Sequence, residues 1–263
     1  DKLGKKILAT GNGKCNYTNY HQEPSCYRGG DTKSAMKVYE AFDVYKTIHF
    51  FQDIGIYPKE RGGYLYPNSG QAASILDVLL LEAKRRMVHM VCNTKVTQIQ
   101  KKKGRFVVVT SDKTYEADHV ILTTGGCASP KLGSDGSGYT FAKALGHKII
   151  PPLPALVQLK SNAKYLKTLS GVRCDASITL MADAKKIAEE KGEILFANYG
   201  ISGIPVMQVS RFAAVSLADK KKVELLIDFI PELSQQQVLD EVERRIASGK
   251  ERTAEELFIG LFN

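Results

Sequence analysis

The sequence predicts an α/β protein in which short strands alternate with helices and lead into glycine-rich loops. Two observations support this fold class. Apolar runs at residues 5–10 and 119–123 each lead directly into glycines, and such loops at strand ends are typical of nucleotide-binding α/β sheets. After a proline-rich stretch at residues 149–154, successive strand-like segments follow, which indicates a second domain. The predicted domains are residues 1–151 and 152–263.

The first of these domains opens with a predicted strand at residues 5–10. Helical spacing of apolar residues predicts helices at residues 34–43, 45–54 and 71–87. Alternation around two adjacent glycines predicts a β-hairpin at residues 57–66. Further strands are expected at residues 89–93, 95–101, 105–111 and 114–117. The wholly apolar run 119–123 predicts a strand covered on both faces, as in a parallel sheet, and residues 139–145 predict a helix.

The second domain is predicted to be β-rich at first and helical at its end. Strands are expected at residues 156–160, 176–181, 193–197 and 222–228. Two helices are expected at residues 234–247 and 253–261, the first with Ser234 as its N-cap.

Composition limits the class of protein. The chain has 263 residues, 43% of them hydrophobic, and no apolar run of about 18 residues that would predict a membrane-spanning helix. Its five cysteines are widely spaced and form no metal-ligand pattern, so we expect a reduced, cytoplasmic protein without a metal site. The net charge of +9 is compatible with nucleic acid or with an anionic cofactor. The lysine triplets at residues 101–103 and 220–222 are interpreted as solvated turns.

The first glycine loop is ATGNGKCN, which ends at Asn16. Gly11 and Gly13 lack a Cβ atom, so a ligand could approach the main chain closely. Lys14 would add a positive charge, and Asn12 could both donate and accept hydrogen bonds. An ordinary tight turn is the alternative for this loop.

Two further glycine loops follow later in the chain. Thr123, Thr124, Gly125 and Gly126 come directly after the apolar run, where open α/β sheets bind ligands; a tight strand exit is the alternative. Residues 133–139 precede a helix whose N-terminal amides could hold an anion. Ordinary capping by Asp135 or Ser137 is the favoured interpretation of that third loop.

Candidate nucleophiles and acid–base groups are few. Cys15 lies beside Lys14, which could lower the pKa of its thiol, but a packed or ligand-facing structural thiol is the favoured interpretation. His49 and His89 lie in apolar surroundings and are interpreted as residues at the edge of a core, and His147 as a turn residue. No catalytic residue can be assigned.

Taken together, the loops and their order resemble one bacterial flavoprotein family. The matching segments are GKKILATGNGKCNYTN, ERGGYLYPNSGQAASILDVLL, HVILTTGGCASPKLGSDGSGYTFAKALGHKIIPPLPALVQL and GEILFANYGISGIPVMQVSR. The family includes aminoacetone oxidase and the 3-dehydro-bile-acid Δ4,6-reductases, within the two-dinucleotide-binding-domain flavoproteins. Departures are lysine at Lys5 and Lys14, where arginine is usual, and Ser137, where aspartate is common.

The resemblance implies a Rossmann-like FAD-binding domain with an inserted β-rich and helical domain. It implies an FAD-dependent oxidoreductase that acts on a small-molecule substrate, with NAD(P)H as a possible electron donor and with no nucleic-acid or membrane partner. Val96 would present its backbone to the adenine. The implied cofactor-binding residues are Lys6, Thr10, Gly11, Asn12, Gly13, Lys14, Cys15, Asn16, Val96, Thr123, Thr124, Gly125 and Gly126.

The family's opening GxGxxG loop and its closing FAD-binding segment have no counterpart in the sequence. The chain is therefore interpreted as an internal fragment that binds FAD poorly and is inactive alone. Two alternatives stay open: a dinucleotide-dependent dehydrogenase without flavin, and a basic nucleic-acid-binding module without redox activity.

Overall fold

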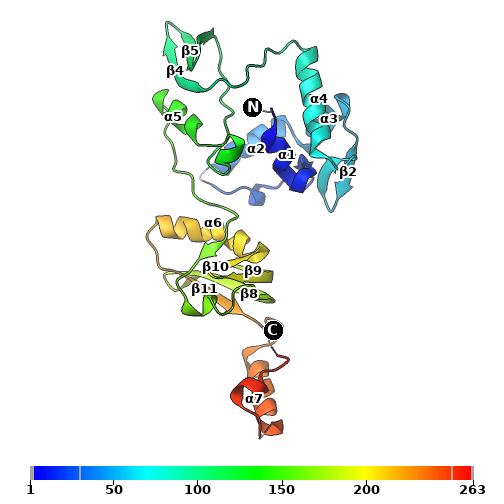
Figure 1. Cartoon of the computed structure of the whole chain (residues 1–263), viewed down its shortest axis with the longest axis vertical. Coiled ribbons are helices and arrows are strands. Elements are labelled where there is room, and N and C mark those ends of the chain that lie inside the picture. The colour runs from blue at the N-terminus through cyan, green and yellow to red at the C-terminus, as the bar shows by residue number, and fades with distance from the viewer. Residues whose placement is uncertain (1–2, 30, 250, 262–263) are drawn as a thin grey trace. The chain divides into compact units, whose positions relative to one another are not determined.

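The computed structural model describes residues 3–29, 31–249 and 251–261 of the chain. These residues fall into two compact units, Asp1–Ile149 (unit 1) and Ile150–Asn263 (unit 2), each of which has its own sheets and helices (Figure 1). Both units contain helices together with antiparallel strands, so the predicted mixed α/β class is confirmed.

Unit 1 begins with a helix instead of the predicted strand. Residues 5–10 form α1 (Lys5–Ala9) and the start of the 3-10 turn η1 (Thr10–Gly13). Ile7 packs against the buried cluster that contains Ile75 of α4 (Ala72–Arg85). The prediction of a strand was wrong because one apolar face suffices for a helix packed on a helix, whereas a strand needs a paired neighbour.

The other early elements of unit 1 follow the predictions. Helices α2 (Thr32–Ala41) and α3 (Val44–Asp53) begin at the aspartate caps Asp31 and Asp43, which accept hydrogen bonds from main-chain amides one turn into each helix. Strands β2 (Pro58–Arg61) and β3 (Tyr64–Pro67) form the predicted hairpin, joined by β1 (Thr18–Asn19) in the order β1-β3-β2. A 3-10 turn, η2 (Pro24–Cys26), lies between β1 and α2.

The later part of unit 1 is a separate three-stranded meander. It consists of β4 (Val96–Lys102), β5 (Arg105–Thr110) and β6 (Thr114–Ala117), as predicted. The 3-10 turn η3 (Pro130–Leu132) and helix α5 (Ser137–Ala144) follow, and α5 packs against β4. At the hairpin turn, Lys103 and Gly104 both have positive φ, so the lysine triplet at 101–103 does lie at a turn.

Two predicted strands of unit 1 do not form. Residues 89–93 and 119–123 have no regular secondary structure, and Ile121 is 87% exposed. A strand buried on both faces needs hydrogen-bonded neighbours, but the strand pairs among the described residues are all antiparallel and none includes residues 119–123. The prediction of a buried strand at residues 119–123 was therefore wrong for the described structure.

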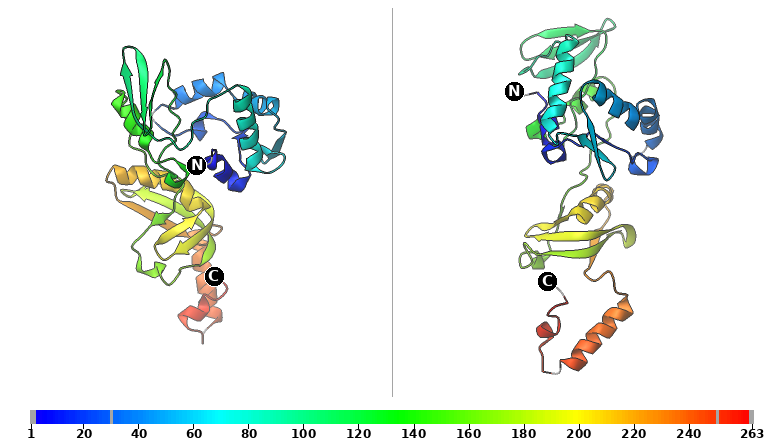
Figure 2. Two further views of the ribbon diagram at one scale, coloured as in Figure 1. Left: turned by 45° about the horizontal axis from the view of Figure 1, so that its top comes forward. Right: turned by 90° about the vertical axis from the view of Figure 1, so that its right-hand side faces the viewer.

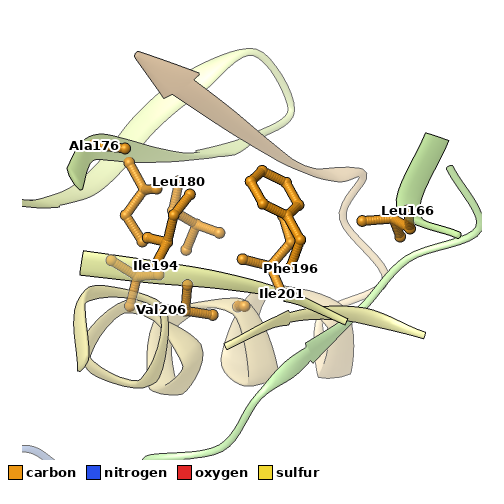
Figure 3. Close-up of a cluster of buried hydrophobic side chains, with 10 residues drawn as sticks. Leu166, Ala176, Leu180, Ile194, Phe196, Ile201 and Val206 are labelled. Atoms are coloured by element: carbon orange, nitrogen blue, oxygen red, sulfur yellow. The ribbon is translucent and has the colours of Figure 1, made fainter. Parts of the chain in front are cut away.

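Unit 2 contains an antiparallel sheet in the order β11-β8-β9-β10-β7. Its strands are β7 (Leu159–Lys160), β8 (Arg173–Ala182), β9 (Lys185–Ala197), β10 (Gly200–Gly203) and β11 (Val223–Asp228). A 3-10 turn, η4 (Lys164–Leu166), precedes β8. Helix α6 (Ile204–Ala218) lies along one face of the sheet in both views of Figure 2. Side chains from that face and from α6, among them Ile194, Phe196 and Val206, form the core (Figure 3).

Helix α6 was not predicted from the sequence. Its residues are apolar around most of the circumference, so the segment lacks the alternation of apolar and polar faces that marks an amphipathic helix. Val206 and Val209 are fully buried against the sheet, which accounts for the apolar composition of that side.

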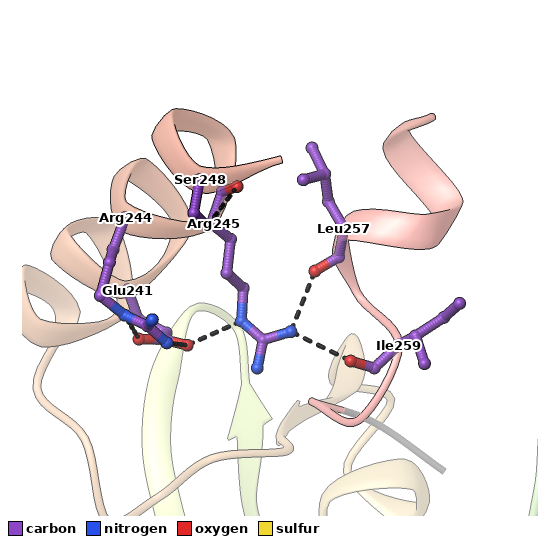
Figure 4. A network of polar contacts seen from close by, with 6 residues as sticks. All are labelled: Glu241, Arg244, Arg245, Ser248, Leu257 and Ile259. Atoms are coloured by element: carbon purple, nitrogen blue, oxygen red, sulfur yellow. Dashed lines mark hydrogen bonds and ion pairs between the residues drawn. The ribbon is translucent and has the colours of Figure 1, made fainter. Parts of the chain in front are cut away.

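Unit 2 ends in two capped helices, α7 (Gln235–Ser248) and α8 (Ala254–Leu257). Ser234 caps α7 as predicted, in a reciprocal capping box with Gln237. The Arg245 guanidinium donates to Glu241 from Nε (2.7 Å) and to the Leu257 carbonyl from Nη1 (3.0 Å), as Figure 4 shows. One side chain thus ties the two helices together. None of the helices described in either unit is long and apolar enough to cross a membrane.

Candidate cofactor-binding site

The first glycine loop is a left-handed turn that connects α1 to β1. Gly11, Asn12 and Gly13 have φ values of 55°, 54° and 80°, a region that glycine and asparagine enter more readily than other residues. The amide of Lys14 donates to the Gly11 carbonyl (3.1 Å), and the amide of Cys15 donates to the Thr10 carbonyl (3.1 Å). These two amides are therefore engaged within the loop, and they hold its shape.

The two glycines of this loop have different surroundings. A Cβ atom on Gly11 would lie 2.7 Å from the main-chain nitrogen of Asn16, closer than real Cβ contacts allow. A Cβ atom on Gly13 would meet nothing within 4 Å. Gly11 is thus required for packing within the loop, whereas the main chain at Gly13 is open to a ligand. The side chains of Asn12 and Lys14, on either side of Gly13, are exposed to solvent.

The end of the loop is anchored in the core of unit 1. Asn16 donates from Nδ2 to the carbonyls of Thr18 (3.2 Å) and Leu65 (3.3 Å), which ties the loop to the β-hairpin. Cys15 is 6% exposed and packs with Ile56 and Ile75. The interpretation of Cys15 as a packed structural thiol is therefore confirmed.

The second and third glycine loops pack on each other. The amide of Gly136 donates to the carbonyl of Gly126 (3.1 Å). A Cβ atom on Gly125 would lie 2.6 Å from Ser134 Oγ, and one on Gly138 would lie 2.0 Å from Thr124 Oγ1. These glycines allow close approach between two segments of the protein, so the Thr123–Thr124–Gly125–Gly126 turn is held by residues 133–139.

The N-cap of α5 is Gly136, which has no side-chain capping bond. The residue before it, Asp135, accepts a hydrogen bond at Oδ1 from the amide of Ser137 (3.0 Å), and hydrogen bonding from Ser137 lowers the pKa of the Asp135 carboxyl. Asp135 therefore engages the first amide of the helix from outside the N-cap position, and the prediction that Asp135 or Ser137 is the N-cap was wrong.

A hydrogen bond connects the first loop region to the second. Lys6 Nζ, on α1, donates to Ser129 Oγ (3.2 Å), three residues beyond Gly126. The predicted residue Val96 lies on β4, the strand that follows α4, opposite Thr110, and no hydrogen bond among the described residues joins it to either loop.

A groove of about 510 Å³ lies beside the second loop. Thr124 and Gly125 line it together with Tyr139 and His147. Sequence reasoning passed over the last two residues: Tyr139 was treated only as a helix residue and His147 as a turn residue. Their position, in and just after the helix that follows a glycine loop, was the available signal. Both side chains can hydrogen-bond to a polar ligand.

The remaining candidate residues are two histidines and the cysteines, and among the described residues they form no metal site. His49 and His89 are exposed, so their assignment to the edge of a core was wrong. The five cysteines are free thiols. No group of three or more potential metal ligands occurs in the part of the chain that the structure describes.

The net positive charge of the protein comes entirely from unit 1. Residues 1–149 contain 22 lysines and arginines against 13 aspartates and glutamates, whereas residues 150–263 contain 15 of each. The whole net charge of +9 therefore belongs to the unit that carries the three glycine loops. Such a field favours an anionic ligand there.

Glycine loops of this kind are typical of nucleotide-binding α/β proteins. The chain matches the HI0933-like protein Rossmann domain over residues 1–210. It is 41% identical over 262 residues to the 3-dehydro-bile acid delta(4,6)-reductase of Clostridium scindens, an alignment that covers 100% of this chain and 64% of that relative. It is 30% identical over 221 residues to the ribosomal RNA dihydrouridine synthase of Haemophilus influenzae, with 80% of this chain and 53% of the relative covered. The enzyme of the same name from Escherichia coli is 28% identical over 216 residues, with 80% and 52% covered.

The chain belongs to the HI0933-like family. Membership of this family implies a flavin cofactor. The chain spans between about half and two thirds of the length of the curated relatives that it matches.

Proposed function

We propose that this protein is an FAD-dependent oxidoreductase and that its glycine loops contact the cofactor. The observation that carries the proposal is the hydrogen bond from Lys6 to Ser129, which connects the regions of the first and second loops across more than a hundred residues. The hydrogen bond from Gly136 to Gly126 joins the third loop to the second. The family match and the basic charge of unit 1 support the same conclusion.

The residues of unit 1 suit an anionic dinucleotide. Gly13 leaves room for a ligand against the main chain, and the exposed Lys14 supplies a cation next to it. Thr124, Tyr139 and His147 line the neighbouring groove with hydrogen-bonding groups. We assign binding and orientation of the cofactor to these residues. A bound flavin would itself supply the two-electron redox chemistry.

For the substrate we propose an α,β-unsaturated carbonyl compound. The names of the relatives describe a reduction at Δ4,6 of a 3-dehydro bile acid and the formation of dihydrouridine. In both cases the alkene that becomes saturated is conjugated with a carbonyl group. We propose that this protein reduces an alkene of that kind in a small molecule, with NAD(P)H as the electron donor.

The proposal is tested with the protein expressed from its complete reading frame. We expect a visible flavin spectrum, reduction of the flavin by NADH or NADPH without oxygen, and reoxidation by a conjugated enone. Lys14→Gln should weaken FAD binding by about threefold to tenfold, since a charge-assisted contact is lost. Lys37→Gln, an exposed lysine on α2, is the matched control and should leave FAD binding unchanged.

Two results would overturn the proposal. A colourless protein that takes up no added FAD would remove the flavoenzyme assignment. Steep salt dependence of RNA binding, with turnover of uridine in RNA and none of small enones, would assign the substrate to nucleic acid instead.

A further inference from the structure

Unit 2 has a groove of about 460 Å³ where β10 leads into α6. Two cationic side chains, Arg173 of β8 and Lys191 of β9, and one acidic side chain, Glu193 of β9, line it together with apolar residues. The apolar lining comes from Leu195, Ile204 and Met207. A groove that is mainly apolar with a few polar groups is the usual form of a small-molecule site.

The strand register explains how three of the lining residues come together. Arg173 lies opposite Leu195, and Leu195 lies opposite Ser202, so these three residues occupy one row across β8, β9 and β10. Side chains directly opposite each other in an antiparallel sheet share a face. The three therefore lie on the same face, which is opposite to the face that carries Phe196 and the core.

The start of α6 closes one side of this groove. Its N-cap is Gly203, which makes no side-chain capping bond, and its first turn contains no acidic residue. A Cβ atom on Gly203 would lie 2.4 Å from the Glu193 carbonyl oxygen, so only glycine lets the helix begin this close to β9. The amides of Ile204 and Val206 and the positive end of the helix dipole are consequently near the groove, whereas Pro205 between them has no N–H.

Ser202 gives an independent indication of a ligand. The residue is 6% exposed and lines the groove, and its hydroxyl makes no hydrogen bond to the described residues. A hydroxyl that lines a groove in this way can donate to or accept from a ligand. A ligand oxygen in the groove would be such a partner.

The charges of the groove indicate how many negative charges a ligand should carry. Arg173 Nη1 lies 2.5 Å from Glu193 Oε1, so the charges of this pair balance. Lys191 also acts on the Glu189 carboxylate, which pairs with Lys186, so Lys191 and the helix end together suit one negative charge better than two. The apolar residues beside them suit a hydrocarbon body.

We propose that this groove binds a carboxylic acid with an apolar body, its carboxylate at Lys191, Ser202 and the start of α6. The site belongs to unit 2 alone and does not depend on the flavin. An experiment can therefore refute or support binding at this site independently of the proposed oxidoreductase activity.

The test uses the 263-residue chain, without added FAD, labelled at its methionine methyl groups for NMR. Met207 lines the groove, and Met207→Leu assigns its signal. We expect octanoate to shift the Met207 signal saturably, while signals from Met36 and Met87 of unit 1 stay in place. Acetate lacks the apolar body and 1-octanol lacks the charge, so each should bind at least about tenfold more weakly than octanoate.

Variants separate this site from unspecific binding. Lys191→Gln should weaken octanoate binding by about tenfold, and Ser202→Ala by about threefold. Lys185→Gln, an exposed lysine on the same strand outside the groove, should bind octanoate like the unchanged chain. Lys191 is exposed, so its replacement should leave the methionine spectrum of the free protein intact. Equal affinity for octanol, no saturable shift at Met207, or unchanged binding in both variants would overturn the proposal.

Discussion

Alanine substitutions at Gly11 and Gly13 should separate the packing role of the first loop from its backbone conformation. Both glycines are left-handed, so alanine at either position costs about 1–2 kcal/mol. Part of that cost is offset, by about 0.4–1 kcal/mol, because alanine also restricts the unfolded chain. For Gly13→Ala, whose Cβ meets nothing within 4 Å, we therefore expect a net loss of about 1 kcal/mol.

Gly11→Ala should cost more because its Cβ would lie 2.7 Å from the main-chain nitrogen of Asn16. That neighbour is backbone and cannot rotate away, and overpacking of this kind adds about 1–3 kcal/mol. The expected total is about 2–4 kcal/mol. In a unit of this size such a loss lowers Tm by roughly 4–16 °C, at about 2–4 °C per kcal/mol.

Urea unfolding followed by tyrosine fluorescence measures this difference in unit 1. The chain has 12 tyrosines and no tryptophan, and only Tyr165 and Tyr199 lie in unit 2. The signal therefore reports mainly on the unit that carries the loop. If Gly13→Ala lowers the unfolding midpoint as much as Gly11→Ala does, the close contact with Asn16 is not what requires glycine at position 11.

Two further predictions concern unit 2. Gly203→Ala should destabilise this unit by about 2–4 kcal/mol, because its Cβ would lie 2.4 Å from the Glu193 carbonyl oxygen. Gly171→Ala, also left-handed but with nothing within 4 Å, should cost only about 1 kcal/mol; equal losses in circular-dichroism melts would contradict the argument. Hydrogen bonds from Arg244 and then Arg245 lower the pKa of Glu241 from its usual 4.5 to about 2. Because the ionised form is favoured in the folded state, this stabilisation is complete above 4.5 and is lost as the pH falls towards about 2. Amide exchange in α7 should rise over that range, and the rise should be smaller in Glu241→Gln than in Glu243→Gln; identical profiles would exclude the Glu241 contacts as its cause.

Features that depend on a few neighbouring residues could be read from the sequence. Helices α2, α3, α4 and α7 have clear periodicity, and a serine before an apolar repeat predicts the N-cap at Ser234. The β2–β3 hairpin and the β4–β5–β6 meander were predicted because their turns and alternation are local. The glycine loops were also identified as the candidate site from sequence alone.

Features that depend on distant partners were decided by the tertiary structure. Residues 5–10 became a helix because α4 offers a surface for it, and residues 119–123 form no strand because nothing in the described chain pairs with them. Helix α6 is apolar on most sides, so its type could not be read from periodicity. The sequence by itself determined the local elements and the chemistry available in the loops. Only the tertiary structure decided which glycines serve packing and which residues meet in the grooves, because burial and strand pairing depend on residues far apart in the chain.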